Sequence, residues 1–202
     1  GERLDQGRRV LDLPGPVACS FFPHAAMTRR LAMQAYHKGK EVLLHQTMQS
    51  IGQLPVGNDA LVLDMTRERL EQVLFRNLQA VPHVVGINNH MGSLITQHPG
   101  HMRWLMAALY QRKGIFFIDS RTTVLTVAEQ TAREFHVPAI RRHVFLDHPD
   151  AKGDIDYQFK RLVRLAHRNG FALAIGHPHD QTLSYLENVL PYISIHGVEL
   201  VT

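Results

Sequence analysis

The chain has 202 residues, of which 45% are hydrophobic and 20% charged, and its formal net charge is +4. This size and composition fit one globular domain, so we expect a single domain over residues 1–202. No run approaches eighteen apolar residues, so we expect no membrane span. The single cysteine excludes an intrachain disulfide framework. The scattered basic residues do not indicate binding to nucleic acid.

Apolar runs suited to buried parallel strands alternate with segments of helical periodicity. The predicted strands are Pro16–Phe22, Glu41–Leu44, His83–Ile87, Ile115–Ile118, His143–Leu146, Phe171–Ile175 and Val198–Val201. The predicted helices are Ala26–His37, Thr66–Gln79, Met102–Arg112, Val124–Phe135, Ile155–Asn169 and Leu183–Leu190. Several of them end at a glycine just before a strand, at Gly39, Gly114 and Gly170. This order predicts an α/β fold with a parallel sheet or barrel.

One long irregular stretch, residues 46–64, interrupts the alternation, and its length is typical of a functional lid or an insertion. The chain also carries fourteen histidines, and histidine is the commonest metal ligand in proteins. Several of them follow predicted strands, as do other polar residues: His24, His45, Asn88, Asn89, His90, Asp119, Ser120, Arg121, Asp147, His148, His177 and His179. In parallel α/β proteins ligands bind beyond the carboxyl ends of the strands, so we expect these side chains to form a site.

The chemistry that such a cluster favours is metal-assisted hydrolysis, because neutral imidazoles bind zinc and the ion activates water. The nonlocal set His45, His90 and His177 supplies the imidazoles. Asp119 is expected to act as a base or to orient one, His177 as a general acid. Arg121 is expected to pair with Asp119 or to stabilise developing negative charge. No Gly-x-Ser-x-Gly elbow surrounds Ser93, which argues against a serine hydrolase.

Six blocks of the sequence occur in the order Leu13–Val17, Glu41–His45, Val85–Ser93, Phe116–Thr122, Val144–Asp147 and Ala174–Pro178. Together they resemble the divergent polysaccharide deacetylases, and the stretch Asn88-Asn89-His90-Met91-Gly92-Ser93 is the most specific part of the resemblance. The resemblance covers nearly the whole chain. It implies a distorted parallel (β/α) barrel of about seven strands, whose first strand, ending in paired aspartates, is expected to be missing ahead of Gly1.

The resemblance also implies a divalent metal, with zinc expected, bound by His45 and His90. His177 then resembles the histidine that acts as acid in the parent deacetylases, and Asp119 resembles a supporting carboxylate. We expect Asn88, Asn89, Ser93 and His179 to contact the substrate. The expected activity is removal of acetyl groups from a cell-envelope polysaccharide by an exported, periplasmic protein, although no signal peptide is visible in this chain.

Two alternatives to an enzyme remain open at this point. The first is a non-catalytic module that binds a glycan or the envelope on a degenerate deacetylase scaffold, which the lack of paired aspartates favours. Asp5 and Asp12 do not follow an apolar run and are poor substitutes for that pair. The second alternative is a structural or partner-binding domain, which would leave the strand-end polar residues without a purpose.

Overall fold

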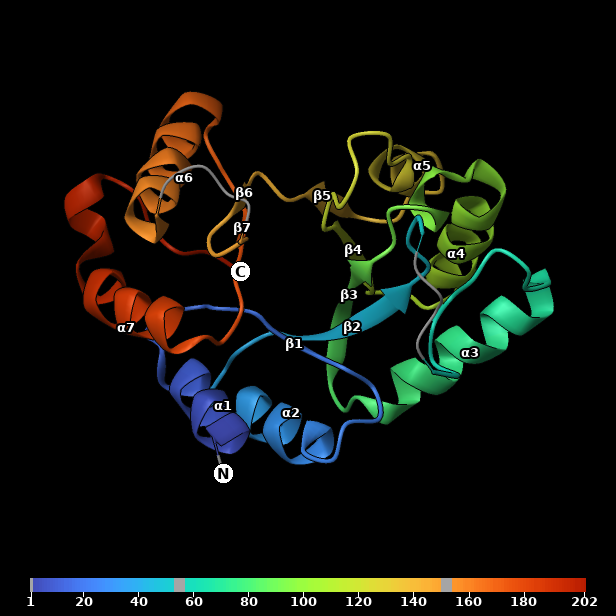
Figure 1. The fold of residues 1–202 in the computed structure, drawn as a ribbon, viewed down its shortest axis with the longest axis horizontal. Coiled ribbons are helices and arrows are strands. Elements are labelled where there is room, and N and C mark those ends of the chain that lie inside the picture. The colour runs from blue at the N-terminus through green and yellow to red at the C-terminus, as the bar shows by residue number, and fades with distance from the viewer. Residues whose placement is uncertain (1, 53–56, 150–153) are drawn as a thin grey trace.

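A computed structural model describes residues 2–52, 57–149 and 154–202 (Figure 1). Its helices are α1 (Glu2–Asp12), α2 (Thr28–His37), α3 (Arg67–Ala80), α4 (Pro99–Gln111), α5 (Ala128–Glu134), α6 (Ile155–Asn169) and α7 (Asp180–Val189), with 3-10 turns η1 (Ile95–Gln97) and η2 (Leu190–His196). Its strands are β1 (Cys19–Phe21), β2 (Val42–Met48), β3 (Val84–Met91), β4 (Phe116–Asp119), β5 (Ala139–Arg141), β6 (Val144–Phe145) and β7 (Ala174–Ile175).

The strands form two parallel sheets. The larger has the order β1-β2-β3-β4-β5, and the smaller pairs β6 with β7. In Figure 1 the helices lie around the strands, with α3, α4 and α5 on one side and α6 and α7 on the other. The predicted α/β class with parallel strands is confirmed. Among the described residues strand pairing does not join the two sheets, so the expected closed barrel is not seen as one hydrogen-bonded ladder.

Two strands continue further than the sequence predicted. We expected strands to end at Leu44 and Ile87, but β2 runs to Met48 and β3 to Met91. The two are paired along this extension, with His45 opposite Asn88 and Thr47 opposite His90. The polar residues that we placed after these strands therefore lie within them, where the ladder satisfies their backbone groups. Their side chains alternate between the two faces of the sheet.

One predicted strand is absent, and two elements are additional. Val198–Val201 forms no strand; Leu200 instead packs, partly buried, against a small apolar cluster. One helix, α1, and one strand, β5, were not predicted. The first places Gly7 against Leu31 of α2, where a Cβ would come within 3.0 Å of a leucine methyl, so the two helices approach closely. The predicted helix ends hold: Gly39, Gly114 and Gly170 all have positive φ.

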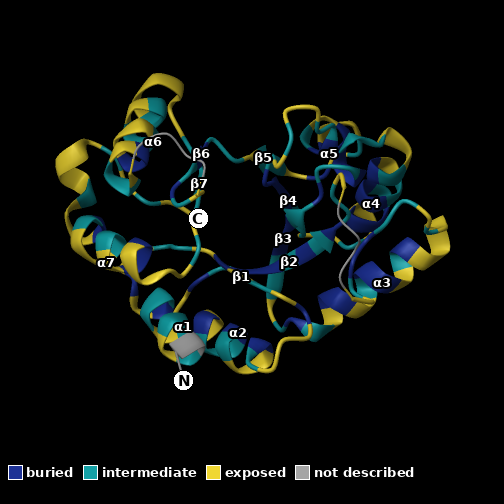
Figure 2. Ribbon diagram, viewed as in Figure 1, coloured by how far each residue is buried: buried dark blue, intermediate teal, exposed yellow. Residues whose placement is uncertain are grey.

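The main core lies between the large sheet and helices α2 to α5. Leu44 of β2, Ile87 of β3 and Phe117 of β4 are fully buried in it, together with residues of the covering helices. Figure 2 shows buried residues along the strands and the inner helix faces, with exposed residues outside. Cys19 is also buried there, and burial raises the pKa of its thiol to about 11, as expected of a core cysteine.

The N-terminal helix is tied to the last one. Arg9 of α1 donates to both carboxylate oxygens of Glu187, at 2.8 and 3.0 Å, and to Asp180 at 3.0 Å. Both acids lie on α7. Beneath them Leu13, Leu183 and Leu190 form a second apolar cluster. These contacts hold helix α7, which follows the smaller sheet, against helix α1, which precedes the larger one. They therefore connect the two parts of the fold although no strand pairing joins the two sheets.

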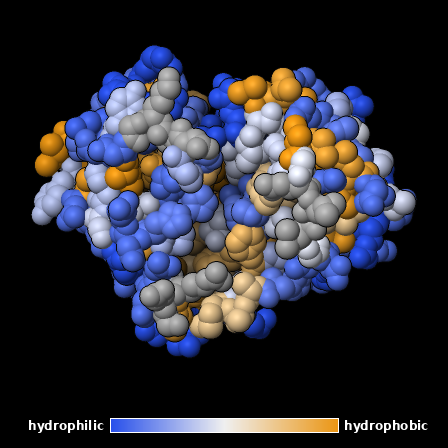
Figure 3. All heavy atoms as spheres, in the orientation of Figure 1, coloured by the Kyte–Doolittle hydropathy of each residue, from blue (hydrophilic) through white to orange (hydrophobic). Residues whose placement is uncertain are grey.

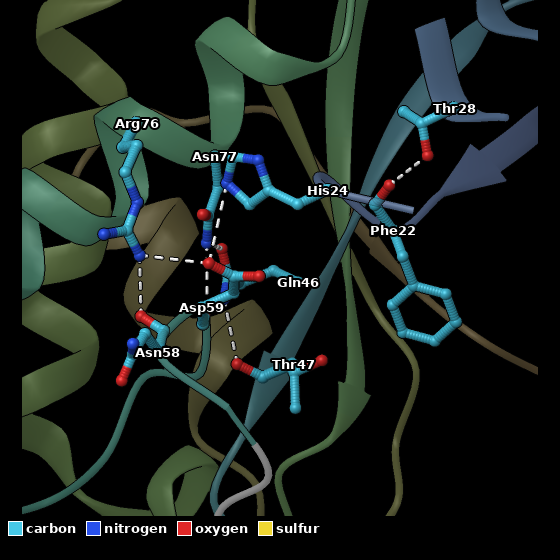
Figure 4. Close-up of polar contacts among 9 residues, drawn as sticks. All are labelled: Phe22, His24, Thr28, Gln46, Thr47, Asn58, Asp59, Arg76 and Asn77. Atoms are coloured by element: carbon cyan, nitrogen blue, oxygen red, sulfur yellow. Dashed lines mark hydrogen bonds and ion pairs between the residues drawn. The ribbon is translucent and has the colours of Figure 1, made fainter. Parts of the chain in front are cut away.

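Polar contacts also hold the irregular segment that we predicted as a lid or insertion (Figure 4). Gln46 and Asn77, both fully buried, donate to the backbone carbonyl of Asp59 at 2.7 and 2.8 Å. The Asp59 carboxylate accepts a hydrogen bond from the Arg76 guanidinium at 3.0 Å, and it lies 3.5 Å from the His24 Nε2 atom. The segment after Gly57 is thus anchored to β2 and α3. Residues 53–56 of the predicted stretch lie outside the described residues.

Leu44→Ala tests whether β2 is the centre of this core. Leu44 is fully buried, so truncation should lower the free energy of unfolding by about 2–5 kcal/mol. The matched control is Val124→Ala, since Val124 is 78% exposed and its loss should change stability by about 0.5 kcal/mol or less. Urea denaturation followed by circular dichroism measures both. Equal effects of the two substitutions would contradict this packing.

Candidate active site

Two histidines face each other at the carboxyl end of the large sheet. His45 comes from β2 and His90 from β3, and the Nε2 atom of the first lies 3.1 Å from the Nδ1 atom of the second. Because side chains alternate, His45 projects from the face opposite Leu44, which packs among the helices. The ring of Phe22 lies edge-on to both imidazoles, with centroid distances of 4.9 Å. The structure therefore brings the two predicted metal ligands together.

Both imidazoles are held neutral by their surroundings. Burial lowers the pKa of His45 to about 4, an effect that the hydrogen bond to Asn88 opposes and nearby His90 and His177 reinforce. Burial, with the charge of His177 acting in the same direction, lowers the pKa of His90 as well. A metal ligand must be the neutral imidazole, so both rings are in the form that binds an ion at neutral pH.

The geometry of the pair fits a shared divalent ion. Imidazole nitrogens bind zinc at about 2.0–2.1 Å, and an ion at that distance from two nitrogens 3.1 Å apart subtends an angle of about 100°. This is close to the tetrahedral angle that zinc prefers. The donor set therefore fits the metal that the sequence suggested, with two imidazoles supplied by neighbouring strands.

Asn88 supports the pair from within β3. Its Oδ1 lies 3.1 Å from His45 Nδ1 and accepts a hydrogen bond from Ser20 at 2.9 Å. Its Nδ2 lies 3.5 Å from the Ser120 hydroxyl. Asn88 is 4% exposed. The residue that we expected to contact substrate thus contacts His45.

A second polar pair comes from the smaller sheet. Asp147 follows β6 and His177 follows β7, and the imidazole Nδ1 lies 3.0 Å from the carboxylate Oδ1. The other carboxylate oxygen accepts the His177 backbone N–H at 2.6 Å and the Thr182 hydroxyl at 2.8 Å. Three hydrogen bonds therefore fix Asp147, and Asp147 fixes the ring of His177. The sequence placed Asp147 at a strand end, but we did not assign it a role; its position after an apolar run, like that of Asp119, was the available signal.

This pair is electrostatically coupled. The hydrogen bond that His177 donates to Asp147 raises the pKa of the imidazole, although partial burial opposes the shift. Burial disfavours the charged form of Asp147, but the hydrogen bonds from His177 and Thr182 outweigh it and lower the pKa of the carboxyl. The pair is therefore a carboxylate next to an imidazole that holds its proton to higher pH than a free histidine.

His179 lies beside this pair on the exposed side. Asp147, His177 and His179 offer ligand atoms that all lie within 4.8 Å of one another, so this group too could hold an ion. An ion there would have to displace the hydrogen bonds that Asp147 already accepts from His177 and Thr182. An ion between His45 and His90 would displace only the one hydrogen bond that joins their two facing nitrogens. The facing histidines are therefore the better candidate for the metal.

Asp119 and Arg121 lie in another environment. Asp119 shares a face of β4 with Phe117, on the helix side of the sheet, and is 1% exposed. Its carboxylate accepts the Arg121 backbone N–H at 2.9 Å and the Thr126 hydroxyl at 2.8 Å. Burial raises its pKa, and these hydrogen bonds act in the opposite direction. The contact between Asp119 and Arg121 is thus made by the backbone N–H of Arg121, in a turn where Arg121 has a φ of 49°, and the predicted role of the guanidinium stays a prediction.

Asn89 and Ser93, which we expected to contact the substrate, form hydrogen bonds with backbone groups of the chain. Asn89, on the same face of β3 as Ile87, accepts the Ser120 backbone N–H and donates to the Met91 carbonyl, both at 2.8 Å. The Ser93 hydroxyl accepts the backbone N–H of Ile51 at 3.1 Å. Their predicted role in substrate binding stays a prediction.

Arg142, which the sequence did not single out, connects the two sheets. It donates to the carbonyls of Ser120 and Arg121 at 2.7 and 2.9 Å, and its guanidinium lies 4.7 Å from the ring centre of Phe145. Phe145 in turn stacks on His177, with ring centres 5.4 Å apart. A cation over an aromatic ring is attractive. Arg142 therefore links the turn after β4 to Phe145, the ring that stacks on the candidate acid His177.

A parallel sheet with imidazoles and a carboxylate at its carboxyl end is the arrangement in which α/β proteins bind ligands. The chain belongs to the divergent polysaccharide deacetylase family, whose model matches residues 1–202. It is similar to YibQ of Escherichia coli K12, an uncharacterized protein, with 36% identity over 94% of this chain and 59% of that protein. An uncharacterized protein of Haemophilus influenzae is 33% identical over 93% and 66% of the two chains. The chain thus spans about three fifths to two thirds of these relatives.

Two solved structures share the fold. The uncharacterized protein ATU2773 of Agrobacterium tumefaciens superposes with a TM-score of 0.91 at 21% identity, over 98% of this chain and 81% of that one. A lactam utilization protein of Thermus thermophilus gives a TM-score of 0.63 at 14% identity, over 96% and 91%. At these identities the likeness concerns the fold alone. Within the described part of the chain no helix is long and apolar enough to cross a membrane.

Asp147→Asn should lower the pKa of His177, because the charge and the hydrogen bond that raise it are lost while burial remains. The intact pair stabilises the fold most between about pH 4 and pH 6.5. The contribution of His177 fades as pH rises through its raised pKa, and that of Asp147 fades as pH falls through its lowered one. NMR titration of the imidazole measures the shift. Asp12→Asn is the control; an unchanged His177 titration in Asp147→Asn would contradict the coupling.

Proposed function

We propose that this chain is a divalent-metal-dependent hydrolase that removes acetyl groups from a cell-envelope polysaccharide or a related glycan. The observation that carries the proposal is the facing pair His45 and His90, whose Nε2 and Nδ1 atoms lie 3.1 Å apart, together with the coupled pair His177 and Asp147. Membership of the divergent polysaccharide deacetylase family supports the substrate class. Zinc is the ion that we expect.

The metal, when bound, would polarise the acetyl carbonyl and lower the pKa of a water molecule. In this chain His45 and His90 would supply two ligands to it. Catalytic zinc sites usually have three protein ligands and one open position. The resemblance to the parent deacetylases implies that a carboxylate of the paired aspartates, which the 202 residues do not include, completes the set.

His177 is suited to act as the general acid. Its Nδ1 is held by Asp147, so Nε2 is the nitrogen left to carry a proton to the leaving amine or alkoxide. The raised pKa keeps this proton on the ring at higher pH than in a free histidine. Asp147 orients the ring and stabilises its charged form, in the manner of a carboxylate behind a catalytic histidine.

The other roles predicted from the sequence stay predictions. Asp119 and Arg121 would act through the turn that they share, which lies beside the Ser120 contact to Asn88. His179 lies at the exposed edge of the His177 pair, where it could contact a sugar. An exported, periplasmic setting is part of the proposal because an envelope glycan is the expected substrate.

The test combines metal analysis with acetate release from N- and O-acetylated oligosaccharides. We expect about one divalent ion per chain, and activity that chelation abolishes and zinc restores. His90→Ala should lose both ion and activity. His177→Gln should keep the ion but lower kcat by about 10²–10⁴-fold, the usual contribution of a positioned acid.

The matched control is His136→Asn, which changes an exposed histidine at positive φ to a residue that tolerates that conformation. It should change neither metal content nor rate. A chain that holds no metal, releases no acetate from any of these substrates and is indifferent to His90→Ala would refute the proposal. Glycan binding that survives chelation would instead identify a non-catalytic binding module.

A further inference from the structure

The His45 ring can serve as a ligand only if the correct nitrogen carries its lone pair. A neutral imidazole has one N–H and one unprotonated nitrogen, and the hydrogen bond made by one nitrogen decides the state of the other. In this site Nε2 of His45 faces His90, while Nδ1 faces the side chain of Asn88. The group that contacts Nδ1 therefore determines whether Nε2 can bind an ion.

We propose that Asn88 is a positioning residue that holds His45 in its Nδ1–H form and so presents Nε2, unprotonated, to a metal shared with His90. The atom 3.1 Å from Nδ1 is the amide oxygen of Asn88, which only accepts hydrogen bonds. Nδ1 must then be the donor. This inference rests on the proposed function, because it concerns the ion that the two histidines would bind.

The amide of Asn88 is itself held on both sides. Its oxygen also accepts the hydroxyl of Ser20 on β1 at 2.9 Å, and its nitrogen lies 3.5 Å from the hydroxyl of Ser120 beyond β4. Because Asn88 and His45 are direct partners in the ladder between β2 and β3, the amide has no freedom to move away from the ring. The contacts come from two neighbouring strands, β1 and β2, and from the turn that follows β4.

Burial protects the hydrogen bond between Asn88 and His45 from competition by water. Asn88 is 4% exposed, so water has little access to compete for its oxygen or for the N–H of His45. Partners of this kind behind a metal-bound histidine typically change metal affinity by about 10–100-fold when they are removed. The role that the structure assigns to Asn88 is thus distinct from the substrate contact that its place in the sequence suggested.

The experiment compares Asn88→Leu with Asn88→Asp. Leucine has a similar size and no acceptor, whereas aspartate keeps an acceptor oxygen. Nitrogen-15 chemical shifts of His45 in the metal-free chain report which nitrogen is protonated. We expect Nδ1–H in the unmodified chain and in Asn88→Asp, and mostly Nε2–H in Asn88→Leu. Ser20→Ala is the matched control, because it removes another donor to the same oxygen and should leave the tautomer unchanged.

The second readout is the dissociation constant for Zn²⁺ alone, from competition with a chromophoric chelator. Asn88→Leu should weaken zinc binding by about 10–100-fold, and Asn88→Asp should restore it to within a few-fold. An Nε2–H form of His45 in the unmodified chain would overturn the proposal without any variant, as would an unchanged tautomer in folded Asn88→Leu. If the tautomer shifts as expected but the unmodified chain binds no zinc, the positioning role stands and the proposed metal-dependent function fails.

Discussion

The register between β2 and β3 is the constraint on which the candidate site depends. It sets His45 opposite Asn88 and Thr47 opposite His90, so that alternate side chains of two neighbouring strands face the same side. A shift of one residue in either strand would turn its imidazole toward the helices and bring its apolar neighbour, Leu44 in β2 or Ile87 in β3, out of the core. The same apolar residues that stabilise the fold therefore determine which polar residues reach the site. Figure 2 shows the buried residues along these strands.

The two halves of the site have opposite electrostatic character. Burial keeps His45 and His90 uncharged, while Asp147 favours the charged form of His177. Hydrolysis with a metal needs this separation, since ligands must be free of protons and the acid must carry one. Arg142 and Phe145 connect the halves across sheets that share no ladder. Most of the face seen in Figure 3 is hydrophilic, with hydrophobic residues gathered in separate patches.

Much of this arrangement could be predicted from the sequence, because apolar runs and helix-ending glycines are local signals. The α/β class, most elements and the family were predicted correctly. Which face of a strand a polar residue occupies depends on register and strand length, and these come from tertiary pairing. Asp119 was for that reason grouped with the histidines, although it shares the helix side with Phe117. The coupling of Asp147 to His177 joins residues thirty positions apart, and no local pattern marks it.

The central claim is that one ion binds between two neighbouring strands, and X-ray absorption at the zinc edge tests it most directly. The account predicts at least two imidazole nitrogens at about 2.0–2.1 Å from zinc in the loaded chain. One of them should disappear in His45→Gln, while His179→Gln should leave the spectrum unchanged. Loss of an imidazole in His179→Gln but not in His45→Gln would place the ion beside Asp147 and contradict the account.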